Sequence, residues 1–269
     1  MANLSTYVLN LDRHPDRLAR MAEQLDAQGI AWARFAAVDA SKVSEEVFDT
    51  LVAPTGPIPR MTRGARACTA GHIAILKVFL AEGSDYALVL EDDAVLAEML
   101  GNDLVALLAT GAFDLLNLNR QTPRRGSKRL VVRRRSALTM DQFSVHDLVG
   151  IHYGTAGYLI SRAAAQVVLD LYPRPNLPID HILFNPNVSR LFGRIRIQQL
   201  FPALVRPREG LVSSIQTEPV AEAGRYRNKL QRARTEIAVA PRLLLGVAAG
   251  FYTVKHLNFG GARGAGRPK

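Results

Sequence analysis

The sequence of 269 residues contains one cysteine, Cys68. A single cysteine excludes an intramolecular disulfide and is typical of a protein in a reducing compartment. The sequence also lacks an apolar run of roughly 18 residues or more, so we expect no membrane-spanning helix. Its first residues have neither a basic region nor a long apolar stretch, so we expect no secretory signal and a cytoplasmic protein.

Positive charge is abundant but unevenly placed. The net charge is +10, and residues 120–135 hold eight Arg or Lys and no acid, whereas residues 220–269 hold ten against two glutamates. The rest of the chain is therefore mildly acidic. Local basic segments indicate polyanionic partners, namely anionic lipid, nucleic acid or phosphorylated glycan. Neither segment has interleaved aromatic residues or a known reading motif, so nucleic acid is the least favoured of the three.

Hydrophobic periodicity predicts alternating strands and helices. Residues 6–11 and 32–38 read as strands around a helix that begins near Pro15 and ends at Gly29, which is a βαβ unit. Further strands are expected at 86–90, 113–118, 130–132, 155–160 and 194–200, and further helices at 65–82, 97–108 and 161–171, with an irregular loop at 39–63. The sequence thus predicts an α/β fold with a main domain at 1–218, a basic amphipathic helical extension at 219–259 and a disordered tail at 260–269.

Three consecutive acidic residues, Glu91, Asp92 and Asp93, follow the apolar run Tyr86–Leu90. Such a run suits a strand covered on both faces, and ligands of open α/β sheets bind at the carboxyl ends of strands. Residues two apart on an extended chain point the same way, roughly 6–7 Å from each other. Glu91 and Asp93 therefore suit one Mg²⁺ or Mn²⁺ ion, with Asp92 turned elsewhere. A solvated acidic turn is the other interpretation.

Five separated segments, taken in order, resemble glycosyltransferase family 25, the lipopolysaccharide and procollagen galactosyltransferase group. They are Tyr7–Arg13 with Arg17, Gly64–Cys68 with His72, Ala87–Ala94, Thr155–Ser161 with Ala163 and Ala164, and Pro178–Asp180. The resemblance covers about residues 5–200. One departure is Gly71, which stands where the family usually has a serine.

This resemblance implies a glycosyltransferase-A-like fold, in which helices flank a mostly parallel mixed sheet. It also implies a metal-dependent, inverting transfer of a hexose, often galactose, from a UDP-sugar to a glycan or lipopolysaccharide-type acceptor, with Mn²⁺ or Mg²⁺ as cofactor. Another metal-dependent nucleotide-handling enzyme, a nucleotidyltransferase or phosphohydrolase, is the alternative. The sequence lacks the Walker-type phosphate loop that would support it.

The predicted site residues follow from these segments. Glu91 and Asp93 are the expected metal ligands, and Asp180 is the expected general base, with a helix N-cap as its alternative role. The expected donor-binding residues are Asn10, Asp12, Arg13, Arg17, His72 and Asp92.

Several of these residues also have ordinary structural roles. Arg13 and Arg17 suit phosphate oxygens, but they also fit a charged first helical turn, and His72 also fits a core position. His152 and His181 are weaker metal-ligand candidates. Cys68 is expected to be a small buried hydrophobe and not a nucleophile.

The basic extension has the composition of an interfacial anchor, because an apolar run at residues 243–254 follows its arginines. We expect it to lie on an anionic membrane surface, at the inner face of the cytoplasmic membrane. The first basic segment would then guide a phosphorylated or lipid-linked acceptor through Arg124, Arg125, Lys128 and Arg133 to Arg135. The alternative is that the apolar run packs on the domain as a core helix.

Overall fold

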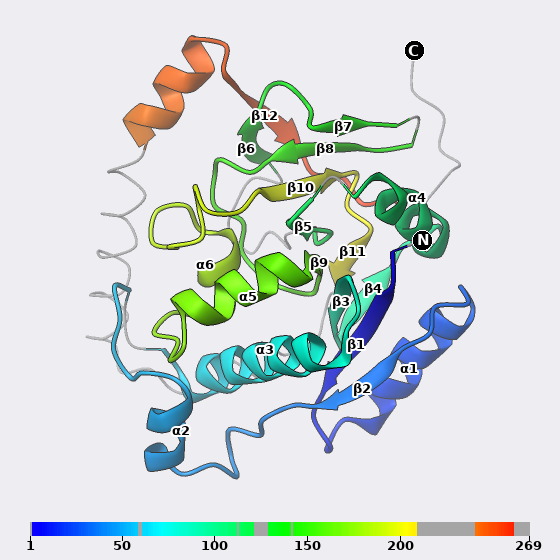
Figure 1. Ribbon diagram of the computed structural model, residues 1–269, viewed down its shortest axis with the longest axis vertical. Coiled ribbons are helices and arrows are strands. Elements are labelled where there is room, and N and C mark those ends of the chain that lie inside the picture. The colour runs from blue at the N-terminus through cyan, green and yellow to red at the C-terminus, as the bar shows by residue number, and fades with distance from the viewer. Residues whose placement is uncertain are drawn as a thin grey trace.

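The computed structural model describes residues 2–58, 61–111, 113–120, 129–140, 142–208 and 240–260. In chain order, the elements are β1 (Leu4–Asn10), α1 (Pro15–Asp26), β2 (Ala33–Ala36), α2 (Glu45–Leu51), α3 (Arg63–Glu82), β3 (Tyr86–Glu91), β4 (Ala94–Leu96), α4 (Leu100–Thr110), β5 (Leu115–Asn117), β6 (Arg129–Arg133), β7 (Leu138–Thr139), β8 (Ser144–Asp147), β9 (Gly157–Ser161), α5 (Arg162–Leu171), α6 (Ile179–Phe184), β10 (Ile197–Phe201), β11 (Val205–Pro207) and β12 (Tyr252–His256) (Figure 1).

The main sheet is mixed, in the order β2-β1-β3-β9-β5-β10-β8-β7. Within the described residues, β9 and β8 run opposite to the other six strands, which share one direction. The predicted α/β architecture, a mostly parallel mixed sheet with flanking helices, is confirmed. Two smaller pairings, β11 with β4 and β12 with β6, extend it.

Both faces of the sheet are buried. Alternate residues of β3 separate cleanly: Ala87 and Val89 enter the core beneath α3, α5 and α6, whereas Leu88 and Leu90 enter the core beneath α1 and α4. All four side chains are fully buried. This two-sided burial explains the continuous apolar run in the sequence and leaves the charged residues at the end of the strand.

Helix α3 is the long core helix of one face. Thr62 caps its first turn by accepting a hydrogen bond from the Ala65 amide, and Gly83 ends it with a φ of 88°. By length and composition α3 is apolar enough to cross a membrane, but 56% of its apolar window is buried inside the fold. It packs against β1, β3 and α5, so the structure uses it as a core helix.

The loop predicted for residues 39–63 is wrong in one stretch, because Glu45–Leu51 form α2. Ser44 accepts a hydrogen bond from the Val47 amide, and Glu45 and Glu46 occupy the first turn. These are ordinary helix-start signals. The prolines and the glycine that follow them in the sequence favoured a loop prediction for the whole stretch.

The C-terminal prediction is also corrected in part. Residues 240–248 are helical, but Tyr252–His256 form β12, antiparallel to β6, where a helix was expected. Aromatic and β-branched residues favour a strand, and β6 supplies the backbone partners. The core-helix alternative for residues 243–254 is wrong, because Leu244, Leu245 and Phe251 are 69–70% exposed. The predictions for 219–239, for the tail from 261, and for Arg124, Arg125 and Lys128 lie outside the described residues.

Candidate active site

The acidic residues lie at the tip of two adjacent parallel strands. Leu9 of β1 is the register partner of Glu91 of β3, and the Asp92 amide donates to the Leu9 carbonyl over 3.2 Å. Because the two strands end together, Glu91, Asp92 and Asp93 line one pocket with Arg13 and Arg17 from the segment after β1. The predicted cleft at the first strand's tip is therefore present.

The rest of the pocket wall is largely apolar. It comes from the ends of β1 and β2 and from the first turns of α3: Leu9, Leu11, Ala37, Val38, Ala67 and Cys68. A charged floor beside an apolar wall is the surface that a nucleotide needs, because its base is apolar and its phosphates are anionic.

Asp92 is held toward β1. Its Oδ2 accepts from Asn10 Nδ2 at 2.7 Å, and Arg17 lies 3.5 Å from its Oδ1. Burial raises the pKa of Asp92, and Asn10 and Arg17 oppose that rise. Asn10 is itself 1% exposed and also contacts the His14 carbonyl and Arg34. Asn10 therefore orients Asp92 from behind the pocket wall.

The neighbouring residues Asp12 and Arg13, just before α1, have different surroundings. Arg13 lines the pocket and pairs with Asp39, whereas Asp12 pairs with Arg34 of β2 and its side chain is 71% exposed. Asp12 thus lies outside the pocket, because the neighbouring parallel strand places a cation on its outer side. Arg34 lowers the pKa of the Asp12 carboxyl.

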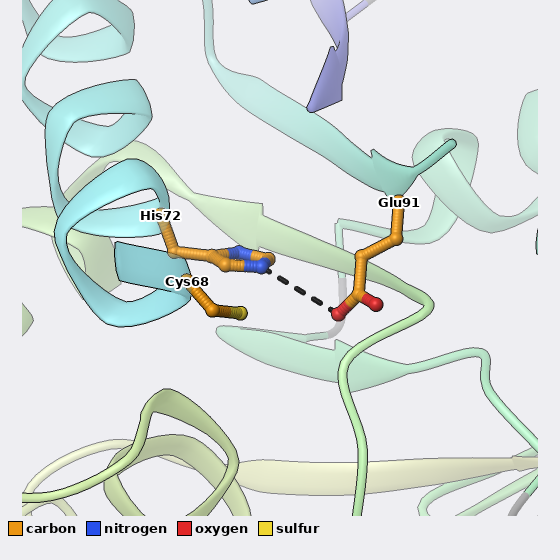
Figure 2. A group of neighbouring side chains, drawn as sticks. All are labelled: Cys68, His72 and Glu91. Atoms are coloured by element: carbon orange, nitrogen blue, oxygen red, sulfur yellow. Dashed lines mark ion pairs between the residues drawn. The ribbon is translucent and has the colours of Figure 1, made fainter. Parts of the chain in front are cut away.

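Glu91 points away from Asp92, toward α3. Thr155 Oγ1 donates to Glu91 Oε1 at 2.5 Å, and His72 Nε2 lies 3.7 Å from the same oxygen (Figure 2). Burial acts to raise the pKa of Glu91, but His72 and Thr155 outweigh it and lower the pKa. His72 is fully buried and does not line the pocket, so Glu91 stands between it and any ligand.

Asp93 has the most unfavourable surroundings of the three acids. Burial first, and then the charges of Glu91 and Asp92, raise the pKa of Asp93 to about 7. Among the described residues, Arg17 is the cation that opposes the rise in the pKa of Asp93. Three crowded carboxylates favour a bound cation, and oxygen ligands suit a hard divalent one. Glu91 and Asp93 therefore fit Mg²⁺ or Mn²⁺. The extended chain stops at Glu91, so their cooperation depends on the turn before β4 and not on strand alternation.

Asp180 lies in the first turn of α6 and is not the N-cap, which is Pro178. The Gly154 amide donates to Oδ2 at 3.2 Å, and the His181 amide donates to Oδ1 at 2.9 Å. Burial, followed by the charges of Glu91, Asp180 and Asp93, raises the pKa of the Cys68 thiol. Asp180 is therefore electrostatically coupled to the pocket, although it does not line it. A protonated Cys68 thiol agrees with the expectation that it is not a nucleophile.

The two weaker histidine candidates have other partners. His152 Nε2 lies 3.0 Å from the Asn119 carbonyl, and burial lowers its pKa to about 4. His181 Nδ1 lies 2.7 Å from Asn185 Nδ2. Among the described residues, the group of three or more His, Cys, Asp and Glu side chains close enough to hold a metal is Cys68, His72 and Glu91, without His152 or His181.

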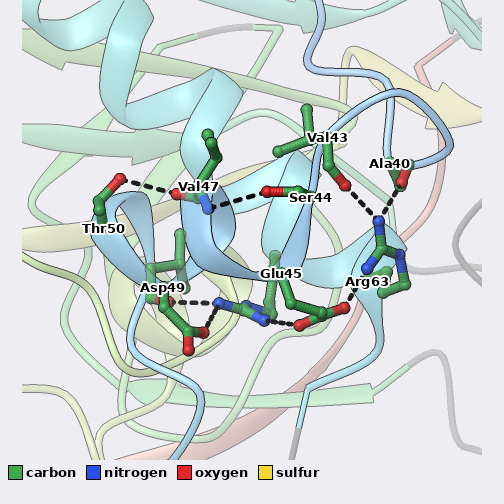
Figure 3. Close-up of polar contacts among 10 residues, drawn as sticks. Ala40, Val43, Ser44, Glu45, Val47, Asp49, Thr50 and Arg63 are labelled. Atoms are coloured by element: carbon green, nitrogen blue, oxygen red, sulfur yellow. Dashed lines mark hydrogen bonds and ion pairs between the residues drawn. The ribbon is translucent and has the colours of Figure 1, made fainter.

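Helix α2 fixes the pocket wall from outside (Figure 3). Arg63 donates to the carbonyls of Ala40 and Val43, and the 3% exposed Arg66 pairs with Glu45 at 2.8 Å and Asp49 at 2.5 Å. These contacts tie the segment after β2 to the first turn of α3. Both segments line the pocket, so the two arginines fix its width.

Comparison with known proteins decides the family. Residues 3–183 match the description of glycosyltransferase family 25 (LPS biosynthesis protein). The chain belongs to glycosyltransferase family 25. The enzyme is 29% identical over 215 residues to the lacto-N-neotetraose biosynthesis glycosyltransferase LgtB of Neisseria meningitidis serogroup B, covering 75% of this chain and 74% of the relative. It is 28% identical over 201 residues to a glycosyltransferase 25 family member of Aedes aegypti, covering 68% of this chain but 32% of the mosquito protein.

Solved structures are more distant from this family 25 enzyme. A glycosyltransferase involved in glycosylation of the major capsid of PBCV-1 aligns with a TM-score of 0.42 at 9% identity, covering 86% of this chain and 99% of that one. The galactosyltransferase LgtC in complex with donor and acceptor sugar analogs aligns with a TM-score of 0.39 at 14% identity, covering 85% and 95%.

The structure explains the departure of this family 25 chain at Gly71. A Cβ added there would lie 3.0 Å from Leu9 Cδ1, because α3 packs closely on β1 at this point. Glycine permits that approach. A serine at position 71 would require Leu9, which also lines the pocket, to shift.

Sequence reasoning missed two groups that hold the site residues of the glycosyltransferase. Thr155 fixes Glu91, and the Tyr158 hydroxyl lies 3.1 Å from His72 Nδ1. Both lie in the segment Thr155–Ser161 that resembles the family. Their partners are 64 and 86 residues away in the sequence, so the segment alone could not show these contacts. Arg34 and Asp39, which pair with the helix-start residues, had no sequence signal.

The raised pKa of Asp93 predicts that removing its carboxylate increases the stability of the fold in a pH-dependent way. A raised pKa in the fold means that stability falls as pH rises from about 4 to about 7, because the folded chain then retains a proton that the unfolded chain has lost. In metal-free buffer at pH 8, we expect Asp93→Asn to be more stable than the wild type by up to about 4 kcal/mol, with the gain vanishing near pH 4. Urea denaturation across this range measures it. Asp16→Asn is the control, because Arg20 lowers the pKa of that exposed carboxyl; an equal gain in both variants would contradict the prediction.

Proposed function

We propose that this glycosyltransferase moves a hexose, with galactose as the first candidate, from a UDP-sugar to a glycan or lipopolysaccharide-type acceptor, with inversion and with Mn²⁺ or Mg²⁺. The observation that carries the proposal is the pocket that joins Arg13 and Arg17 to Glu91, Asp92 and Asp93. Family membership supports glycosyl transfer over the nucleotidyltransferase and phosphohydrolase alternatives.

On the donor side, charge is matched in two ways. Arg13 and Arg17 line the pocket and would pair with pyrophosphate oxygens, since a guanidinium binds such oxygens in a fork. Glu91 and Asp93 would hold the divalent cation, which when bound supplies Lewis-acid stabilisation of the departing diphosphate. Asp92, fixed by Asn10, is placed for the ribose hydroxyls, and the apolar wall with Leu11 and Val38 for the base.

On the acceptor side, Asp180 is the proposed general base. Two backbone amides hold its carboxylate in a fixed orientation, and its charge contributes to the raised pKa of Cys68, which lines the pocket. An inverting transfer requires a base that takes the proton of the acceptor hydroxyl while the diphosphate leaves from the opposite face of the sugar. Relatives named for lacto-N-neotetraose biosynthesis support a glycan acceptor.

Donor binding predicts a metal-dependent thermal shift. A ligand that binds the folded chain raises its melting temperature, by an amount set by concentration over Kd. We expect a panel of nucleotide sugars to give a shift for UDP-sugars with Mn²⁺, and little shift without it or in Asp93→Ala. Arg17→Ala should lose most of the shift, whereas Arg20→Ala, which removes an exposed arginine of the same helix, should keep it. The absence of a shift with every UDP-sugar would remove the donor assignment.

Substitution of the proposed base separates binding from chemistry. Asp180→Asn keeps a carbonyl oxygen that can accept from an amide, but it loses the basic carboxylate. We expect kcat to fall about 10²- to 10⁴-fold while the UDP-sugar thermal shift stays unchanged. Steady-state kinetics with a saturating glycan acceptor measures the effect. Unchanged turnover would exclude Asp180 as the base.

We propose further that the enzyme works at the anionic inner face of the cytoplasmic membrane. Leu244, Leu245 and Phe251 form an exposed apolar patch on the C-terminal helix and the turn after it, at the edge of the molecule (Figure 1). Arg134 adjoins this patch, since its amide donates to the Phe251 carbonyl at 3.0 Å, and Arg242 is exposed on the same helix. Exposed apolar side chains beside arginines suit a surface with acyl chains and anionic headgroups.

Vesicle binding tests this placement. We expect the enzyme to sediment with vesicles that contain phosphatidylglycerol and not with neutral ones. The double substitution Leu244→Ser and Leu245→Ser should weaken binding about tenfold or more, because two buried leucines contribute several kcal/mol at most. Val105→Ser removes a 61% exposed valine from α4 and serves as the matched control. Equal binding by all three proteins, or equal binding to neutral vesicles, would contradict the proposal.

A further inference from the structure

Three side chains at one wall of the pocket have the chemistry of a different metal site. Cys68 and His72 lie four residues apart on one side of α3, and Glu91 faces them from the end of β3 (Figure 2). One ligand atom from each, a sulfur, a ring nitrogen and a carboxylate oxygen, lies within 4.8 Å of the other two. This set is distinct from the oxygen-only pair Glu91 and Asp93.

The nitrogen of His72 that faces Glu91 is an independent sign of a ligand. His72 is fully buried, and its Nε2 has no hydrogen-bond partner among the described residues. The other nitrogen, Nδ1, lies 3.1 Å from the Tyr158 hydroxyl, which can donate or accept. When Nδ1 carries the proton and donates to Tyr158, Nε2 presents a lone pair to the Glu91 carboxylate at 3.7 Å. In that tautomer two acceptors face each other in a buried place, where either a proton on Nε2 or a metal cation between them relieves the repulsion.

We propose that Cys68, His72 and Glu91 bind a thiophilic divalent cation of the Zn²⁺ class. Sulfur and imidazole ligands select Zn²⁺ and Co²⁺ over Mg²⁺ and Mn²⁺, which prefer oxygen. Bond lengths of about 2.0–2.3 Å place tetrahedral ligand atoms roughly 3.3–3.7 Å apart, and His72 Nε2 and Glu91 Oε1 already have that separation. Tyr158 acts behind the site, where a partner on the second ring nitrogen fixes the tautomer that binds metal.

Two features of the site follow from its place in the wall. Cys68 and Glu91 both line the pocket, so the fourth coordination position opens toward it. Binding converts the Cys68 thiol to a thiolate bonded to the cation, and the thiol proton goes to solvent. No electron transfer is involved.

Glu91 is a ligand both of this site and of the Mn²⁺ site in the proposed function, so occupancy of one affects the other. This consequence rests on the proposed function. Glu91 cannot turn toward Asp93 while it holds a cation with Cys68 and His72. Occupancy by Zn²⁺ therefore removes one ligand from the Mn²⁺ that supports transfer. The expected result is inhibition by Zn²⁺ that raised Mn²⁺ relieves, because the two ions compete for Glu91, and that is absent from Cys68→Ser.

Cobalt spectroscopy tests the site without any donor or acceptor. Cys68 is the one cysteine of the chain, so a near-ultraviolet sulfur-to-cobalt charge-transfer band can come from no other residue. We expect the metal-free full chain to develop this band with one equivalent of Co²⁺, and Zn²⁺ to abolish it by displacement. The band should be absent in Cys68→Ser, and Co²⁺ should bind about tenfold more weakly or worse in His72→Gln and in Glu91→Gln.

Matched controls separate coordination from unfolding and from the donor site. Asp93→Asn and His256→Gln, the latter an exposed histidine on β12, should keep the band at wild-type intensity. Circular dichroism identifies any variant that fails to fold. If the buried His72→Gln variant does not fold, Glu91→Gln tests the coordination in its place. A wild type without the band, or a band unchanged in both His72→Gln and Glu91→Gln, overturns the proposal. Because no sugar nucleotide is present, either result leaves the proposed transfer reaction to its own tests.

Discussion

Crowding of negative charge at the end of one buried strand is the constraint on which the rest of this site depends. The parallel register of β1 and β3 brings Glu91, Asp92 and Asp93 to the tip of the first strand, where all three are half-buried. The three acids differ in the groups that offset the unfavourable burial of their charge. Asp92 uses Asn10 and Arg17, Glu91 uses Thr155 and His72, and Asp93 has a raised pKa. The one carboxylate without a sufficient partner is the one that most needs a cation.

The surroundings of the acids are built to hold them in these separate directions. Asn10 joins β1, the start of α1 and Asp92, so the helix that supplies Arg13 and Arg17 is tied to the acidic turn. On the other side, β9 runs antiparallel beside β3 and delivers Thr155 and Tyr158 to Glu91 and His72. The antiparallel strand inserted into a mostly parallel sheet thus has a role in the site, because it turns Glu91 toward α3.

Glu91 borders two groups of potential metal ligands, so the site can suit two kinds of cation. Toward the pocket it is one of three oxygen donors that suit a hard cation, and toward α3 it faces a thiol and an imidazole that suit a softer one. Which cation the site holds then depends on the orientation of one side chain. A short, closely packed approach of α3 to β1 at Gly71 keeps Cys68 and His72 near enough for the second arrangement.

The sequence alone was sufficient for the α/β class, the family, the strand that carries the acids and the arginines beside them. These follow from local features: two-sided burial produces a continuous apolar run, helix starts have characteristic residues, and the family segments are contiguous. Only the tertiary structure decided that Asp12 faces outward, that Asn10 and His72 lie behind the pocket wall, and that residues 252–256 form a strand. Each of these depends on a partner distant in sequence, such as Arg34, Tyr158 or β6. The pattern of a single segment cannot encode which distant group will meet it, because that contact exists only after both have packed on the same sheet.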